Sequence, residues 1–160
     1  MATFEFKGID NYIKQLNELQ TATKDGVVGK TVYAGAAVVA DSVRRAIQAL
    51  PVGDGRARDG LISTVTLPQK SGLLDGFGIS PIRDDDGFIN VKLGFDGYNG
   101  TRTKNYPKGQ PNVVIARAVN SGTTFRKKTK FVDKAVKSAK KAAEAAMAAA
   151  CSREIEKIMK

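Results

Sequence analysis

The segment that most resembles a chemical motif is KDGVVGKT, residues 24–31, which ends like a phosphate-binding loop. Such a loop holds phosphates with backbone N–H groups, a lysine and a hydroxyl, and it requires a first glycine and a preceding strand. Lys24 occupies the place of that glycine, and the residues before it have the apolar spacing of an amphipathic helix. We therefore expect the start of a helix here and no nucleotide site.

Acid–base and metal chemistry are equally poorly supported. Asp84, Asp85 and Asp86 are followed by Gly87, and an Asp-Gly pair between two apolar runs predicts a hairpin turn. No glutamate follows at the place that a calcium loop requires. The chain has no histidine and a single cysteine, Cys151, so the usual general base and zinc ligands are missing. We expect no catalytic residue, no metal and no cofactor, and hence no enzyme.

Positive charge is concentrated towards the C-terminal end of the chain. The formal net charge is +10, and most of the excess follows Ser121, where Arg126, Lys127, Lys128 and Lys130 form a cluster. A lysine-rich helix is most often a solvated face, although this charge would also suit an acidic protein or a nucleic acid. A basic DNA-binding protein therefore remains an alternative hypothesis.

A long polar loop at residues 97–112 is a second candidate contact surface. It is rich in Gly, Asn and Pro, and loops of this length are usually functional or mobile. Its aromatic and basic side chains could stack on bases, but the same types are enriched in protein interfaces. We favour protein docking or simple mobility, with these candidate contacts: Tyr98, Arg102, Lys104, Tyr106 and Lys108.

The elements that position these residues follow from the spacing of apolar side chains. Residues 3–7 alternate like a strand, residues 9–19 have helical spacing, and a second helix is expected over about residues 27–50, ended by Pro51. Four later runs look strand-like: residues 61–67, 73–79, 88–95 and 112–119. The fold class expected is α+β, a single domain with an antiparallel β-sheet packed against two N-terminal helices and one long C-terminal helix.

The C-terminal helix is expected to run from about Lys130 to the end of the chain, with an alanine-rich stripe packed closely against a neighbour. At its entry, Gly122 can adopt a positive φ, Thr129 can cap the helix, and Phe131 can dock between helix and sheet like a hydrophobic staple. The expected structural anchors are Gly122, Thr123, Thr129 and Phe131. The expected stripe consists of Val132, Ala135, Val136, Ala139, Ala142, Ala143, Ala146, Met147 and Ala150.

Three segments together carry a resemblance to a known family: FEFKGIDNYIKQLNELQ, AIQALPVGDG and ARAVNSGTTFRKKTKFVDKAV. Their order resembles the HK97-type tail-component family of long-tailed phages, the tail-completion or head-tail joining proteins. The resemblance covers most of the chain, so residues 1–160 would form one tail-completion-like domain. Two positions depart from the family pattern: Asn120 stands where an acidic residue is common, and Lys130 stands where a proline is common.

The resemblance implies a structural virion protein of the neck or tail top, present in the host cytoplasm during assembly, that makes a finished tail competent to join a DNA-filled head. It implies a homo-oligomeric ring, with a hexamer as the favoured size, bound to head-closure or connector, tail terminator and tail tube proteins. DNA contact would be weak and nonspecific at most, and no membrane would be involved. A tail terminator that caps the tail tube is the alternative within the same particle.

Overall fold

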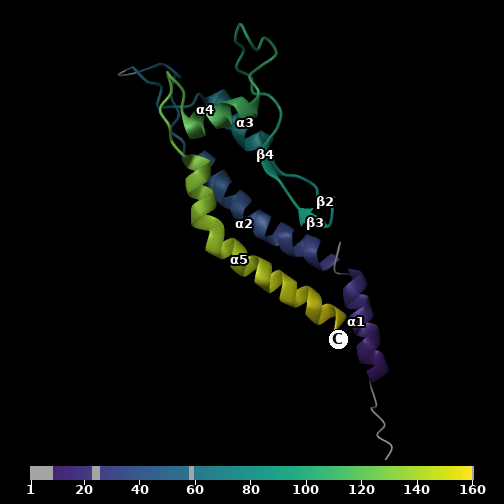
Figure 1. Ribbon diagram of the computed structural model, residues 1–160. Helices are drawn as coiled ribbons and strands as arrows, with labels where there is room; N and C mark the ends of the chain where they lie inside the picture. The colour runs from purple at the N-terminus through teal and green to yellow at the C-terminus, as the bar shows by residue number, and fades with distance from the viewer. Residues whose placement is uncertain (1–8, 23–25, 58–59, 160) are drawn as a thin grey trace, which may run out of the picture.

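Two long antiparallel helices form the axis of the molecule (Figure 1). The computed structural model describes residues 9–22, 26–57 and 60–159. Helix α2 (Val28–Gln48) lies beside helix α5 (Phe131–Ile158), and the smaller elements gather where α2 ends and α5 begins. Helix α1 (Ile9–Ala22) lies at the opposite end, near the C-terminus. The chain is thus a mixed helix and sheet protein with N-terminal helices and a long C-terminal helix, as the sequence predicted.

Small residues allow α2 and α5 to pack closely. A Cβ on Gly35 of α2 would lie 2.5 Å from Cγ of Met147 in α5, and the Ser42 hydroxyl donates a hydrogen bond to the Ala135 carbonyl at 3.1 Å. The buried alanines of α5 include Ala135, Ala139 and Ala143, which recur every fourth residue along one face. The small-residue stripe is confirmed in outline, but Val136 and Ala142 were wrongly included, since both are exposed.

The strands form two separate antiparallel ribbons. Strand β1 (Phe77–Ile79) pairs with β4 (Leu93–Phe95), and β2 (Arg83–Asp85) pairs with β3 (Phe88–Asn90). Asp86 and Gly87 both have positive φ, of 55° and 90°, as a two-residue hairpin turn requires, so the predicted turn is confirmed. The run 88–95, expected as one strand, is divided between the two ribbons.

The run 112–119 was wrongly predicted to be a strand, because it forms helix α4 (Asn112–Ser121). Its valines and isoleucine favour strands, but its buried residues are Asn112, Ile115, Ala116 and Val119, which have helical spacing. Pro111 precedes the first turn, where its missing N–H has no consequence. Tertiary burial of one helical face therefore overrides strand propensity here.

Two other expected strands are also mostly wrong. In the run 61–67, Ile62 and Val65 form only isolated bridges, and Leu67 begins helix α3 (Leu67–Gly76). Thr66 and Gln69 form a capping box at the start of α3, so most of the run 73–79 is helical and only its last three residues form β1. The strand expected at residues 3–7 lies outside the described residues.

The core lies at the end of the molecule where α3, α4 and the β1–β4 ribbon meet the two long helices. Five of its side chains are almost fully buried: Val43, Ile47, Val65, Leu73 and Val119. The ammonium of Lys70 in α3 donates to the carbonyls of Gln48 and Leu50, which ties α3 to the end of α2. This end of the molecule is therefore a rigid support for the loops that leave it.

Candidate partner-binding surfaces

The turn between α4 and α5 is fixed by backbone geometry. Gly122 has a φ of 79°, the left-handed conformation expected of it, and a Cβ there would lie 3.0 Å from Cβ of Lys128. Thr123 and Arg126 exchange backbone hydrogen bonds at 3.0 and 3.2 Å, which closes the turn. Of the expected anchors, Gly122 and Thr123 thus act through the main chain.

Thr129 does not cap α5, contrary to expectation. Its hydroxyl donates to the carbonyl of Val119 at 2.8 Å, and the residue at the cap position is Lys130, with a left-handed φ of 55°. The N–H of Val132, in the first turn of α5, instead donates to Oδ1 of Asn120, 3.0 Å away at the end of α4. The cap therefore comes from a residue distant in sequence, which local motif rules do not detect.

Phe131 is buried, as the sequence predicted, with 6% of its surface exposed. Its ring lies edge-on to Phe95 of β4 at a centroid distance of 6.4 Å, and Phe95 in turn contacts Phe77 of β1 at 5.0 Å. These three rings pack the start of α5 against the β1–β4 ribbon. Phe131 is accordingly part of the core and unavailable to a partner.

The basic cluster divides into one structural residue and three exposed ones. Arg126 is only 9% exposed, and its Nη1 donates to the Thr64 carbonyl at 2.8 Å, so its expected role as a partner contact is wrong. Burial lowers the pKa of the Arg126 guanidinium. Lys127, Lys128 and Lys130 are exposed. The surface cluster is therefore these three lysines, which we call the lysine turn.

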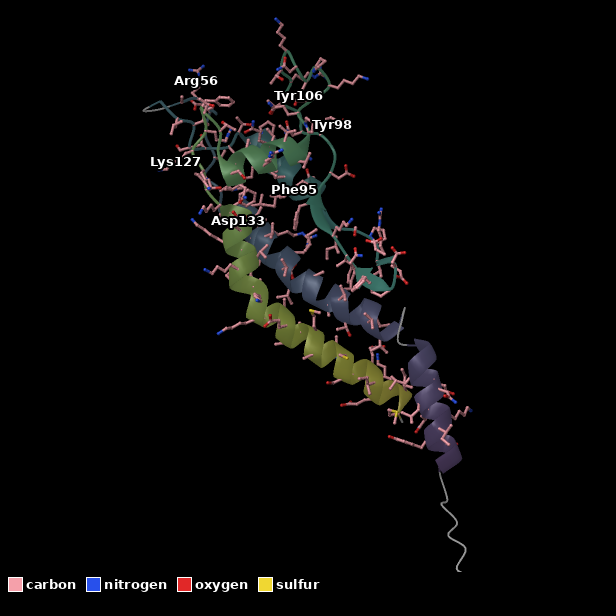
Figure 2. All side chains as sticks on the ribbon, viewed as in Figure 1. Arg56, Phe95, Tyr98, Tyr106, Lys127 and Asp133 are labelled. Carbon is pink, nitrogen blue, oxygen red and sulfur yellow. The ribbon has the colours of Figure 1, made fainter. Side chains whose placement is uncertain are left out.

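The start of the lysine turn is held by backbone hydrogen bonds to Ile62. Ile62 donates its N–H to the Phe125 carbonyl, and Lys127 donates to the Ile62 carbonyl, both at 2.9 Å. Phe125 itself is 62% exposed. Figure 2 shows Arg56, Tyr98, Tyr106 and Lys127 at the same end of the molecule. An exposed aromatic side chain thus lies next to three exposed lysines, which are residue types found at the centre and at the charged rim of protein interfaces.

The long loop, residues 97–111, projects beyond α3 and α4 as an arm (Figure 1). Its base carries more structure than the composition suggested. Asn99 donates its N–H to the Gln110 carbonyl, Gln110 to the Thr101 carbonyl, and Asn112 to the Gly97 carbonyl, all at 2.9 to 3.0 Å. The predicted contacts Tyr98, Arg102, Lys104 and Lys108 are exposed, whereas Tyr106 is half-buried. The base of the arm is thus held by backbone hydrogen bonds, and its basic side chains are exposed.

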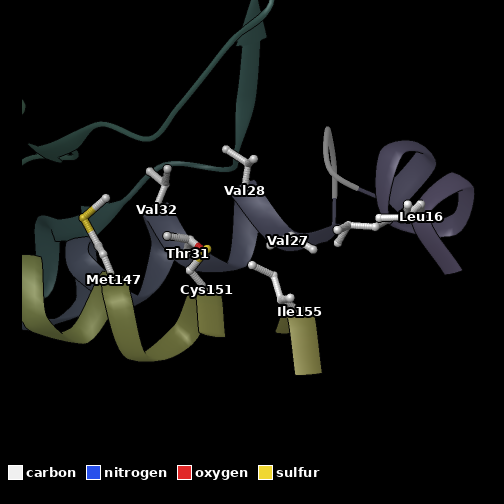
Figure 3. Close-up of a pocket in the computed structure, with 9 residues that line it drawn as sticks. Leu16, Val27, Val28, Thr31, Val32, Met147, Cys151 and Ile155 are labelled. Carbon is white, nitrogen blue, oxygen red and sulfur yellow. The ribbon is translucent and has the colours of Figure 1, made fainter. Parts of the chain in front are cut away.

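Helix α1 carries an apolar face that the rest of the described chain leaves largely uncovered. Tyr12, Ile13 and Leu16 are 53%, 49% and 41% exposed. Next to this face, a pocket of about 440 Å³ opens between α1, the start of α2 and the end of α5 (Figure 3). Apart from Thr31 and Cys151 its lining is apolar. The exposed apolar side chains of α1 and the apolar pocket therefore lie side by side.

One ion-pair group joins the ends of α2 and α5 beside this pocket. Glu154 accepts hydrogen bonds from Lys157 and from Lys30, the latter at 2.6 Å, and its side chain is 15% exposed. The hydrogen bonds from Lys157 and Lys30 lower the pKa of Glu154 to about 2. Lys30 is the lysine of the phosphate-loop-like segment. It lies in helix α2, and its ammonium pairs with the carboxylate of Glu154 in α5.

The described residues contain no cluster of metal-ligating side chains. Residues 9–22, 26–57 and 60–159 contain no group of three or more Cys, Asp or Glu side chains able to hold a metal ion. Within the same ranges, no helix has the length and apolar character needed to cross a bilayer.

No protein-family model, curated protein or solved structure matches the chain.

Sequence reasoning gave no structural role to two residues, Asn120, which caps α5, and Phe125, which is exposed beside the lysine turn. Asn120 was considered only as a departure from a family pattern, although a polar residue two positions before a helix-ending glycine is a signal for capping or turn formation. Phe125 was not singled out from the sequence. An aromatic residue between a Gly-Thr-Thr turn and consecutive cations is more informative as a possible contact than the cations themselves.

Proposed function

We propose that this protein is a structural virion component of a long-tailed phage or prophage that acts in tail completion and head-tail joining at the neck. The observation that carries the proposal is the order of its sequence motifs, from an amphipathic N-terminal helix to a Gly-Thr turn, a phenylalanine and a long final helix. In this role the protein performs no chemistry and holds no cofactor. It works by binding neighbours.

The distribution of exposed groups supports such a role. A joining protein needs separate surfaces for its own copies and for partners on either side. Exposed basic and aromatic groups lie at the end that bears the arm and the lysine turn, while the apolar face of α1 lies at the other end. Two chemically different surfaces at opposite ends of an elongated molecule suit a protein that bridges two assemblies.

In this proposal the apolar face of α1 contacts a neighbouring copy, and the charged end contacts head-closure or connector, tail terminator and tail tube proteins. We propose that the α1 face of one copy meets a different surface of the next copy, so that the association is head-to-tail and closes into a ring, for which six subunits is the favoured size. The site of action is then the neck or tail top, after assembly in the host cytoplasm.

The proposal is tested by deleting the gene from a phage that carries it. We expect complete DNA-filled heads and complete free tails to accumulate separately, and joining to be restored when the purified protein is added to the lysate. Electron microscopy of the lysates counts heads, tails and joined particles. Normal joined particles without the gene would contradict the proposal.

The same images separate the alternatives. A tail terminator would be required for tail length, so its loss would give tails of abnormal length. A DNA-binding protein would leave joining intact. Its support lies in the lysine turn and the basic arm, and it predicts duplex binding that weakens steeply with salt.

A further inference from the structure

The apolar pocket between α1, the start of α2 and the end of α5 is large enough to enclose bulky side chains (Figure 3). Its volume of about 440 Å³ lies in the range of about 300 to 1,000 Å³ that is usual for pockets enclosing a ligand. Filling an apolar hollow with apolar groups is favourable, because it removes both surfaces from water. A matching occupant is therefore hydrophobic and bulky.

The opening of this pocket is bounded by exposed apolar side chains. Leu16 of α1 is 41% exposed, Ile155 of α5 is 37% exposed, and both line the pocket. By contrast, Val27, at the start of α2, is only 4% exposed. The uncovered surface therefore lies between α1 and the end of α5, which is where an occupant would lie.

The chain itself carries bulky apolar residues close to this opening. Residues 1–8, with the sequence MATFEFKG, directly precede α1 and lie outside the described residues. Phe4 and Phe6 alternate with charged residues, so in an extended chain both rings would project to the same side. Gly8, the last residue before α1, permits backbone conformations in which the chain reverses direction. This composition suits a segment that turns back and covers an apolar surface.

The length of this segment matches the distance to the pocket. Counted from Ile9, the pocket residues Leu16 and Leu19 lie about 10 and 15 Å along α1, at about 1.5 Å per residue. An extended chain covers at most about 3.3 to 3.6 Å per residue, so Phe6 and Phe4 can lie up to about 10 and 17 Å back from Ile9. A segment that runs back beside α1 therefore brings its two rings to the levels of the two leucines.

We infer that residues 3–7 turn back along α1 of their own chain and insert Phe4 and Phe6 into this pocket. The inserted rings hold α1 against the two long helices. Tyr12 and Ile13 of α1 do not line the pocket and are exposed, so they stay available to the neighbouring copy of the proposed ring. The inference concerns a single chain, and it holds whether or not the protein acts in a virion.

Cys151 provides a native reporter of whether the pocket is filled, because it is the only cysteine of the chain and lines the pocket. The test measures by mass spectrometry how fast N-ethylmaleimide modifies Cys151, relative to the same chain unfolded in urea. We expect Phe4→Ser/Phe6→Ser to raise this relative rate at least about tenfold. The reason is that modification requires the pocket to open, and burial of two phenyl rings favours the filled state.

Phe88→Ser/Phe125→Ser is the matched control variant. It removes two rings that are 77% and 62% exposed in other parts of the molecule, so its relative rate should equal that of the unaltered chain. A synthetic peptide of residues 1–8, added to Phe4→Ser/Phe6→Ser, should slow the modification of Cys151 again. The same peptide with both serine substitutions should have no effect.

A second measurement detects the contact directly by NMR. In a chain labelled both in its phenylalanine rings and in its valine and isoleucine methyl groups, we expect nuclear Overhauser contacts from Phe4 and Phe6 to Val28 and Ile155. A mixture of ring-labelled chains and methyl-labelled chains shows only contacts between copies. We expect none of these ring-to-methyl contacts in the mixture.

Three results would overturn the inference. The first is an equal rate of Cys151 modification in the unaltered chain and in Phe4→Ser/Phe6→Ser. The second is the absence of ring-to-methyl contacts in the doubly labelled chain. The third is the appearance of those contacts in the mixture, which would assign the pocket to the N-terminal segment of a neighbouring copy.

Discussion

Asn120 links the last turn of α4 to the first turn of α5 through three hydrogen bonds. Its carbonyl accepts from the Lys130 N–H at 2.9 Å, its Oδ1 accepts from the Val132 N–H, and its Nδ2 donates to Asp133 at 3.3 Å. The side chain of Asn120 thus supplies the helix cap, and its main-chain carbonyl holds the left-handed residue before the helix. This explains how α5 starts sharply although Lys130 itself provides no cap.

Removing this side chain should destabilise the whole domain, because α5 packs along its length. We expect Asn120→Ala to lower the free energy of unfolding by about 1 to 2 kcal/mol. Asn120→Asp/Asp133→Asn keeps an acceptor for the Val132 N–H and exchanges the two partners of the Asn120–Asp133 hydrogen bond without adding charge, so its loss should be smaller. Urea denaturation of the three proteins measures both differences. Equal loss in the two variants would show that the cap acceptor is not what stabilises α5.

Phe131 provides a second prediction at the level of the single residue. Because its ring is buried against Phe95, we expect Phe131→Ala to lower the free energy of unfolding by about 3 to 5 kcal/mol. Phe125→Ala is the matched control, since that ring is exposed and its loss should change stability by about 0.5 kcal/mol or less. Thermal unfolding midpoints of both variants and of the unaltered protein measure these differences in stability. Similar midpoints for the two would contradict the assignment of Phe131 to the core.

At the level of elements, the sequence predicted the long helices better than the small elements between them. Helices α2 and α5 have sustained periodicity and clear ends, Pro51 among them, so pattern reasoning located both. Helix α3 was missed although Thr66 and Gln69 have the spacing of a capping box, because the apolar run around them was read as a strand. Helix α4 was missed because its β-branched residues favour strands, and only tertiary packing reveals which face is buried.

Glu154 makes the α2–α5 pairing sensitive to pH. Its pKa is about 2 in the folded protein, below the value of about 4.3 expected when unfolded. A lowered carboxyl pKa stabilises the fold fully above the unfolded value, and the contribution is lost as pH falls through about 4 towards 2. The free energy of unfolding of the unaltered protein should therefore be larger than that of Glu154→Gln at pH 6. This difference should disappear near pH 2.

Chemical denaturation at a series of pH values measures this difference, with Glu156→Gln as the matched control. Glu156 lies exposed on the same helix and forms no ion pair among the described residues. Its substitution should leave stability nearly unchanged at every pH. A constant gap between wild type and Glu154→Gln from pH 6 to pH 2 would show that packing, and not the ion pair, sets the contribution of Glu154.

At the level of the whole molecule, the sequence indicated which residues are charged but not which of them meet solvent. Arg126 and the three lysines after it form one run in sequence, yet Arg126 is buried against Thr64 and the lysines are exposed. The distinction depends on a contact between segments sixty residues apart, which local pattern does not reveal. A variant that neutralised all four would confuse loss of folding with loss of binding.

A test of assembly should therefore change only the three lysines of the lysine turn and leave Arg126 in place. We expect Lys127→Gln/Lys128→Gln/Lys130→Asn to slow head-tail joining by about tenfold, because an acidic partner surface would no longer be steered towards this end. Asparagine is chosen at position 130 because it tolerates the positive φ found there. The measurement is the rate at which purified heads and tails join when the protein is added.

Lys137→Gln/Lys140→Gln/Lys141→Gln removes the same charge from the exposed face of α5 and should join heads and tails at the rate of the unaltered protein. Comparing the two triple variants separates an effect of position from an effect of net charge, since steering depends on where the charge lies. If both variants join normally, and the unaltered protein binds duplex DNA tightly with a steep salt dependence, the lysines serve nucleic acid and the DNA-binding alternative replaces the joining role.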